Sequence, residues 1–372
     1  MKEKFDIIVI GAGLSSLMFL VKYVKKHPQQ KILLLDKDHD KKNDQTFCVW
    51  QGPDIINLTD EFDIQPKKIW GKIMLDFQNR SIKKVMSPYN YKAYDGQKTL
   101  SSLLRSCKKN ITYKNNCEVV QVKKNGLFYV ITKDSSVYSS QTLVDSRHYH
   151  NTYDSKEMLY QAFYGSEVEM PTNTFDETTV TLMSFKENKN DIEFTYILPY
   201  TKKIALIETT FFAKNPNIND IKLKHEKKLK QYGKYTLLRS EEGILPMGNI
   251  KTDKEGSYLK IGISAGMIRP SSGYSMIRIA NWINQIEDTE LNQQNLSKFR
   301  FKSPWLLNWL DKQFLKVCFY RPEIAPELFM SLFSKANIGS VVRFMADKPT
   351  INDIIAVIQA LPKKIMIKYL IK

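Results

Sequence analysis

The fold is decided by the stretch FDIIVIGAGLSS at residues 5–16, which is followed by an aspartate at position 36. Residues 5–10 form a short apolar run rich in β-branched side chains, which predicts a buried strand. Residues 14–26 repeat apolar side chains at helical spacing, and residues 31–35 form a second apolar run. A strand, a glycine turn, a helix and a second strand in this order predict the start of a doubly wound α/β fold with a parallel sheet.

The turn between the first strand and the helix has the residues needed to hold a dinucleotide. Gly11 allows the tight turn, and Gly13 lets the backbone approach a pyrophosphate. Leu14 opens the helix, whose free N–H groups and dipole favour phosphate. Ser16 is small enough for close packing of helix on strand, and Asp36 is placed to accept hydrogen bonds from ribose hydroxyls. The alternative is a tight turn that binds no ligand.

A second glycine segment late in the chain favours FAD over NAD. Residues 259–264 predict a buried strand, and a helix is predicted from about residue 274 to residue 286. Between them, Gly266 would let the backbone pass close to the isoalloxazine ring or ribityl chain of a flavin. Pro270 and Gly273 follow in the same turn. A strand, turn and helix without any cofactor contact is the alternative.

The remaining patterns predict a second, mostly β domain and a helical C-terminal region. Residues 118–122, 127–132 and 141–144 predict a three-stranded segment, and residues 159–212 predict an antiparallel sheet. The predicted architecture is an FAD-binding Rossmann-type two-domain flavoprotein with an inserted antiparallel β-sheet substrate domain. The expected boundaries are 1–80, 110–150 and 257–290 for the FAD-binding domain, 81–109 and 151–256 for the substrate domain, and 291–372 for the helical C-terminal region.

Composition limits the partners. The chain carries 56 Lys and Arg against 39 Asp and Glu, which favours anionic partners, but no nucleic-acid-binding signature accompanies the charge and we expect no nucleic acid partner. Its four cysteines have no metal-type spacing, so we expect no metal site and a reducing cytoplasm. No apolar segment is long enough to predict a spanning helix.

The C-terminal region combines an excess of basic residues with tryptophan and other large apolar residues. Residues 301–372 hold 11 Lys and Arg against 5 Asp and Glu. Four lysines follow position 362. The apolar and aromatic residues that cluster as a helical face would are Trp305, Leu306, Leu307, Trp309, Leu310 and Phe314. Tryptophan beside lysine suits a membrane interface, so we expect peripheral association with the cytoplasmic membrane. An ordinary helical cap on the second domain is the alternative.

Six short motifs recur in the order and spacing of a known family. They are NDQTFCVW at 43–50, DSR at 145–147, FD with TLM at 175–183, YILPY with LIETT at 196–210, ILPM at 244–247, and a glycine with PSSGY at 266–274. Together these motifs resemble the bacterial lycopene β-cyclases. The sequence departs from the family pattern at Gln45, Phe47, Ala162, Ser166 and Ser184.

The resemblance implies a lycopene cyclase of carotenoid biosynthesis, an isomerase that closes the ψ-ends of lycopene or a related acyclic carotene to β-rings. It implies Glu208 as the general acid, FAD acting in its reduced form without net redox, and NAD(P)H as the reductant. Aromatic side chains are candidates to line the polyene channel. Trp50 and Tyr196 are the candidate substrate-binding residues, and Tyr91, Tyr94 and Phe163 are the further candidates. The alternative for each of them is ordinary packing in the core.

The strand pattern around Glu208 supports that role independently. On strand alternation, Glu208 shares one face with Leu206, Thr210 and Phe212, and a carboxyl on an apolar face is unfavourable unless it faces a cavity or water. A glutamate of an edge strand that points to solvent is the alternative. Two other functions remain open: an FAD-dependent monooxygenase or prenyl-chain reductase of the same fold, or a non-enzymatic prenyl-lipid carrier.

Overall fold

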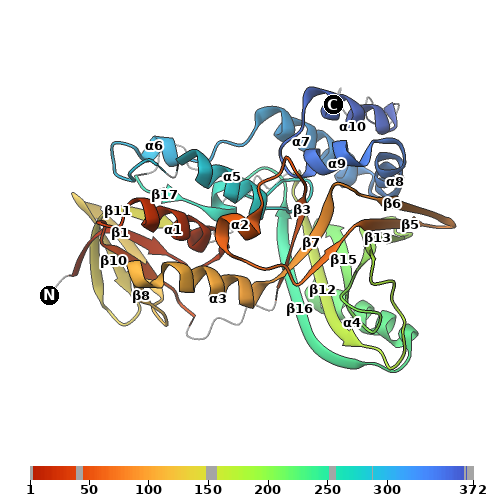
Figure 1. Cartoon of the computed structure of the whole chain (residues 1–372), viewed down its shortest axis with the longest axis horizontal. Helices are drawn as coiled ribbons and strands as arrows, with labels where there is room; N and C mark the ends of the chain where they lie inside the picture. Colours follow the sequence, from red (N-terminus) through yellow and green to blue (C-terminus); the bar gives the residue numbers. More distant parts are fainter. Residues whose placement is uncertain are drawn as a thin grey trace.

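The computed structural model describes residues 3–38, 45–147, 157–250, 257–286, 288–363 and 366. Two seven-stranded sheets and one three-stranded sheet form the body of the molecule, and helices of the C-terminal region lie over one of the large sheets (Figure 1). The predicted fold class is therefore confirmed. Asn43, Asp44 and the lysines at 364, 368 and 372 lie outside the described residues.

The first sheet is the predicted parallel unit. Strand β1 (Glu3–Ile10) lies between β2 (Ile32–Leu35) and β11 (Val137–Asp145) and is parallel to both. Helix α1 (Leu14–Lys26) has the predicted bounds. It ends two residues before Pro28, because the residue that precedes a proline, here His27, disfavours the helical conformation. Ile7 and Val9 of β1 pack in the core cluster that includes α1, so both faces of β1 are buried, as is usual for parallel strands.

A three-stranded antiparallel segment continues this sheet on the far side of β1. It consists of β9 (Val119–Asn125), β10 (Leu127–Thr132) and β11, in the order that the sequence predicts. Phe128 and Val130 of β10 pack with Ile8 and Ile10 of β1 in a second core cluster. The short strand β8 (Thr112–Lys114) extends the other edge of the sheet beside β2, and α3 (Gly96–Cys107) packs against α1.

The chain returns to this sheet through a strand that is shorter than expected. The returning strand β17 spans only Leu259–Lys260 and pairs with β11, so the prediction of a strand over 259–264 is wrong beyond Lys260. A 3₁₀ turn at Gly262–Ala265 follows, because Gly262 and Gly266 adopt φ values of 74° and 73° that an extended strand does not allow. Helix α5 (Met276–Ile286) then packs against α1.

The second sheet has the order β16-β12-β15-β14-β13-β5-β6. Its antiparallel central strands confirm the sheet predicted over 159–212. Helix α4 (Ile218–Leu229) packs on β12 and β15. The strands are β5 (Lys72–Phe77), β6 (Arg80–Val85), β12 (Leu159–Glu169), β13 (Thr179–Lys186), β14 (Ile192–Pro199), β15 (Ile204–Ala213) and β16 (Thr236–Met247).

The domain boundaries stay a prediction, but one strand pairs with a different sheet from the one that these boundaries imply. Strand β5 lies within the range 1–80 expected for the FAD-binding domain, yet it pairs with β13 of the second sheet. Pairing with a distant strand leaves no signal in the local sequence. A small third sheet consists of β3 (Thr46–Gln51), β4 (Lys68–Trp70) and β7 (Asn90–Asp95), and β7 is its middle strand. The short helix α2 (Leu58–Phe62) lies between β3 and β4 in the chain.

The C-terminal region is helical, as predicted. It comprises α6 (Leu296–Phe299), α7 (Trp305–Tyr320), α8 (Ala325–Lys335), α9 (Ile338–Met345) and α10 (Ile351–Ala360). Helix α8 packs on β5 and β6, and α10 lies outermost in this group (Figure 1). Among the residues that the structure describes, no helix is long and apolar enough to cross a bilayer.

Candidate active site

The glycine turn after β1 leaves open space at the first turn of α1. A Cβ atom built on Gly13 would meet no atom within 4 Å, and Gly13 caps α1 without any side-chain hydrogen bond. The N–H groups of the first helical turn are therefore free for an anionic ligand. The hydroxyl of Ser16 is buried and has no hydrogen-bond partner among the described residues. These features fit a bound pyrophosphate.

Asp36 supports this turn from behind. Its Oδ2 accepts a hydrogen bond of 2.6 Å from the backbone N–H of Ala12, and its Oδ1 accepts one of 3.0 Å from Asp38. Gly11 has φ of +91°, and a Cβ there would come within 2.5 Å of Ser146 Oγ, so only glycine fits. The role of Asp36 toward a ribose stays a prediction.

A cavity of about 440 Å³ extends from this turn to the second sheet. Gly13, Leu14, Gly273, Trp50, Tyr196 and Glu208 all line it, so the structure brings together predicted residues from both domains. Gly11, Ser16, Asp36, Gly266 and Pro270 are not among its lining residues. The volume lies within the range of small-molecule and cofactor sites.

Each of the six sequence motifs contributes to the wall of this cavity. The lining residues from them are Gln45, Thr46, Phe47, Cys48 and Trp50; Ser146; Leu182 and Met183; Tyr196, Glu208 and Thr210; Leu245; and Ser271, Ser272, Gly273 and Tyr274. Phe329 and Phe333 of α8 close it from the helical side. Segments scattered over the chain therefore converge on one space, which is the arrangement expected of a site rather than of general packing.

Glu208 faces the cavity from the middle of β15. Its neighbours two and four residues on, Thr210 and Phe212, also line the cavity, as strand alternation predicts. Only 6% of Glu208 is exposed. Its register partners are Tyr196 on β14 and Gly165 on β12, so it lies on a central strand and the alternative of a solvent-facing edge glutamate is wrong.

Burial raises the pKa of Glu208 well above its ordinary value, and the neighbouring carboxyl of Glu241 raises it further. The hydroxyl of Thr210 donates to Glu208 Oε1 at 3.1 Å and opposes this shift. The balance favours the protonated form of this acid. A protonated carboxyl group in an apolar cavity is a suitable proton donor.

Three tyrosines and a cysteine form a hydrogen-bonded group beside Glu208. The hydroxyl of Tyr196 lies 2.9 Å from that of Tyr91 and 3.3 Å from Cys48 Sγ, and the Tyr91 hydroxyl lies 2.8 Å from that of Tyr274. The Trp50 ring packs edge-on against Tyr91 with centroids 4.8 Å apart. Burial raises the pKa of Cys48 to about 12. These groups stay neutral and present polarisable faces to the cavity.

Four of the five aromatic residues predicted to line the channel do line the cavity, and one does not. Trp50, Tyr91, Phe163 and Tyr196 line the cavity, whereas Tyr94 does not. Tyr94 is fully buried in the main core cluster, because it follows the register of β7 away from the cavity-facing side. Its expected place in the polyene channel is therefore wrong.

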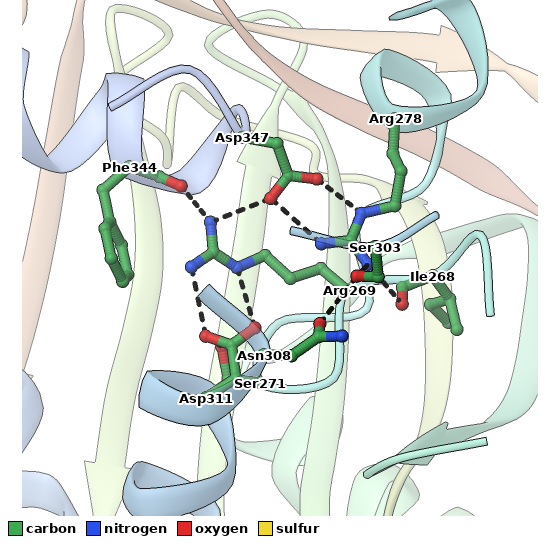
Figure 2. Close-up of polar contacts among 9 residues, drawn as sticks. All are labelled: Ile268, Arg269, Ser271, Arg278, Ser303, Asn308, Asp311, Phe344 and Asp347. Atoms are coloured by element: carbon green, nitrogen blue, oxygen red, sulfur yellow. Dashed lines mark hydrogen bonds and ion pairs between the residues drawn. The ribbon is translucent and has the colours of Figure 1, made fainter. Parts of the chain in front are cut away.

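The loop that carries Ser271–Tyr274 is held by a buried charge network (Figure 2). Arg269 donates to both carboxylate oxygens of Asp311 on α7 at 3.1 Å, and Ser271 donates to the same carboxylate at 2.8 Å. Asp347 pairs with both Arg269 and Arg278. Arg269 and Asp311 are only 1% and 2% exposed. The network fixes the cavity loop against the C-terminal helices.

Glu241 is a site residue that the sequence patterns do not reveal. It lies on β16 and lines the cavity opposite Glu208. Strand β16 exposes many side chains and mixes charged with apolar residues, so neither alternation nor hydrophobicity predicts it. The only signal is the position of Glu241 three residues before the ILPM motif.

The chain is similar in sequence to one protein family and to several known carotenoid enzymes. The family model described as lycopene cyclase protein matches residues 6–366. Capsanthin/capsorubin synthase of Capsicum annuum is 23% identical over 74% of the chain, which spans 58% of that relative's length. Lycopene beta-cyclase of Pantoea ananas is 24% identical, with 74% of this chain and 72% of that protein covered.

Two solved structures share the fold. A geranylgeranyl bacteriochlorophyll reductase-like protein of Thermoplasma acidophilum superposes with a TM-score of 0.64 at 10% identity, covering 99% of both chains. Halogenase PltM in complex with phloroglucinol and FAD superposes with a TM-score of 0.60 at 11% identity, covering 92% of this chain and 82% of that one. The chain therefore has the fold of FAD-dependent oxidoreductases and halogenases.

Proposed function

Because the chain belongs to the lycopene cyclase family, a family of carotenoid cyclases, we propose that it closes the ψ-ends of lycopene or a related acyclic carotene to β-rings. The observation that carries this proposal is the buried carboxyl of Glu208, whose pKa is raised by burial, in a cavity lined mostly by apolar and aromatic side chains. A hydrocarbon offers no group for a nucleophile, so the reaction needs a strong acid in a dry cavity.

FAD fits the end of the cavity at α1. Gly13 and the free N–H groups of the first turn would hold its pyrophosphate, and Gly262, Ile263 and Met267 would lie along the flavin. When bound and reduced, the flavin supplies negative charge that stabilises a developing cation without net electron transfer. NAD(P)H is the proposed source of that reduced state.

The side chains of the chain itself account for the proton steps. The O–H bond of Glu208 breaks as its proton adds to the terminal double bond, and the next double bond closes the ring on the resulting cation. Loss of a neighbouring proton then gives the product double bond, so the net change is an isomerisation. The faces of Trp50 and Tyr196 would stabilise the cation, and Phe329 and Phe333 would exclude water.

The substrate resides in membranes, and we propose that the C-terminal helices meet that surface at the cytoplasmic side. On α10, Ile351, Ile355 and Ile358 are 77%, 46% and 45% exposed and lie along one face. Trp305 and Trp309 of α7 are also exposed, whereas Leu307 is buried and Phe314 packs on Phe329. An amphipathic helix with an exposed apolar face suits the membrane interface.

The test is expression in lycopene-accumulating bacterial cells with pigment analysis. We expect β-ring products from the native chain. Glu208→Gln keeps the shape and removes the transferable proton, so cyclisation should fall by about two to four orders of magnitude while FAD stays bound. Glu193→Gln is the matched control, because Glu193 is equally buried on the neighbouring strand β14 and does not line the cavity.

The role of the flavin is tested separately with dithionite-reduced enzyme and lycopene, without oxygen or nicotinamide. Rings should form over many turnovers while the flavin stays reduced. Flavin oxidation in step with product would instead support a monooxygenase or reductase, and FAD binding without any turnover would support a carrier. A fully active Glu208→Gln variant would exclude Glu208 as the acid.

A further inference from the structure

Two glutamates face each other across a glycine in the second sheet. Gly165 on β12 is in register with Glu208 on β15 and, on its other side, with Glu241 on β16. A Cβ built on Gly165 would lie 2.8 Å from Cγ of Glu208 and 3.3 Å from Cγ of Glu241. Side chains two strands apart normally have a third side chain between them. The glycine removes that side chain, so the two carboxyl groups meet in a hydrogen bond.

The surroundings of the two carboxyl groups differ. Oε2 of Glu241 accepts hydrogen bonds from the Arg239 guanidinium and, at 2.8 Å, from the Thr46 hydroxyl. Arg239 also donates to Thr46 at 2.7 Å and to Glu167 at 2.7 Å. Two donors on one oxygen are the pattern of an ionised carboxylate. Among the described residues, only the Thr210 hydroxyl donates to Glu208.

We propose that Glu241 is a positioning residue of this site: as a fixed carboxylate, it accepts the hydrogen bond of the Glu208 carboxyl, which keeps Glu208 protonated and oriented for proton transfer. The inference rests on the proposed function of Glu208. Like charges this close cannot both be ionised without a large penalty, so one proton is retained by the pair. Arg239 and Thr46 decide which partner keeps it.

The same pair explains how the acid regenerates. When Glu208 gives its proton to the substrate, its O–H bond breaks, and two carboxylates face each other across Gly165. Their repulsion makes Glu208 a stronger base at the moment when the ring cation must lose a neighbouring proton. The C–H electrons form the new double bond and the O–H bond of Glu208 reforms, so no proton is gained or lost over the cycle.

The pH at which Glu208 loses its proton depends on every charged or titratable group that faces it. Arg239 and Glu241 come from β16, Cys48 from β3, Tyr196 from β14 and Thr210 from β15 itself. Burial keeps Cys48 and Tyr196 neutral. Arg239 stays charged, because burial lowers its pKa less than its carboxylate partners Glu241 and Glu167 raise it. Glu241 is therefore the facing group whose removal lowers the pKa of Glu208.

The experiment compares Glu241→Gln with Glu242→Gln in the FAD-loaded enzyme. Glu242 is the next residue on β16 and is exposed on the other side of the strand, so it is a matched control. Cyclisation requires protonated Glu208, which is lost as pH rises through its pKa. Glu241→Gln should move the alkaline limb of the rate profile to lower pH by about one to two pH units and retain most activity at the acidic end. Glu242→Gln should leave the profile unchanged.

A second readout does not depend on turnover. Infrared spectra of enzyme labelled with ¹³C-glutamate should show a protonated carboxyl band at neutral pH that Glu208→Gln removes. In Glu241→Gln this band should titrate at lower pH. An unchanged limb and an unchanged band in Glu241→Gln, or no Glu208 band in the native enzyme, would overturn the inference. If the native enzyme forms no rings but the band behaves as expected, the proposed function fails and the carboxyl pair stands.

Discussion

Two glycines in this site act by the side chain they lack, but in different ways. Gly165 leaves room for Glu208 and Glu241 to meet, and any Cβ there would contact both carboxyl side chains. Gly13 borders open space, and its φ of −77° is accessible to every residue. A substitution at Gly165 therefore disturbs protein contacts, whereas one at Gly13 disturbs only what occupies the cavity.

Gly13→Val should abolish FAD binding without loss of fold. The new side chain would meet no protein atom near its Cβ, but it would fill the space through which the pyrophosphate approaches α1. Flavin absorbance after purification and the thermal midpoint measure the two effects. Gly71→Val is the control, because a Cβ at Gly71 also meets nothing within 4 Å. Full flavin content in Gly13→Val would refute the assignment of the turn.

At this scale, Glu208 is predictable from sequence and Glu241 is not. Glu208 breaks the apolar pattern of a strand, and such a break is visible locally. Glu241 acquires its role from Gly165, which is far away in the sequence, and from Arg239 and Thr46, which come from two different strands. Pairing across sheets follows from the folded register and has no local signature.

At the scale of elements, a buried ion pair connects helix α7 to the cavity loop. Asp311 on α7 binds Arg269 and Ser271. From the spacing of apolar residues, the sequence predicts α1 with its bounds and the helices after residue 296. It does not predict that Asp311 faces inward, because a charged residue on a helix is usually exposed.

Asp311→Ala should destabilise the protein by about 3–5 kcal/mol, since it leaves the Arg269 guanidinium buried with half of its counter-charge removed. Denaturant unfolding followed by circular dichroism measures this loss. The matched control is Asp288→Ala, which removes an ion pair to Lys26 whose aspartate side chain is 78% exposed; its effect should be about 0–1 kcal/mol. Equal effects of the two substitutions would show that the Arg269 network contributes no special stability.

At the scale of the whole molecule, the apolar surface of α10 is the clearest candidate for membrane contact. We expect the protein to float with anionic liposomes and to lose only part of this binding in salt, because salt screens charge and leaves apolar contact intact. Ile355→Glu should remove the salt-resistant part. Ile69→Glu on β4 is the control, since Ile69 is 48% exposed and Ile355 is 46% exposed.

Equal binding to neutral and anionic vesicles, or binding to neither, would contradict the proposed membrane contact. The sequence places that contact on residues 305–314, but the structure turns Leu307 and Phe314 of this run into the core. The class of fold, the parallel unit and the antiparallel sheet all follow from local patterns. The position of α8 over the cavity does not, because it depends on packing between Phe329 and Phe212.

The buried pairing of Arg269 with Asp311 and Asp347 also has a consequence for biosynthesis. A ribosome makes the chain in order, and domains generally fold as their residues emerge. Here β1 can pair with β11 early, but the first sheet gains β17 only after residue 260. Arg269 and Arg278 are synthesised before their carboxylate partners, which belong to α7 and to the turn after α9. In the order of synthesis, the strands of both large sheets therefore precede the carboxylates that neutralise Arg269 and Arg278, which come only with α7 and with the turn after α9.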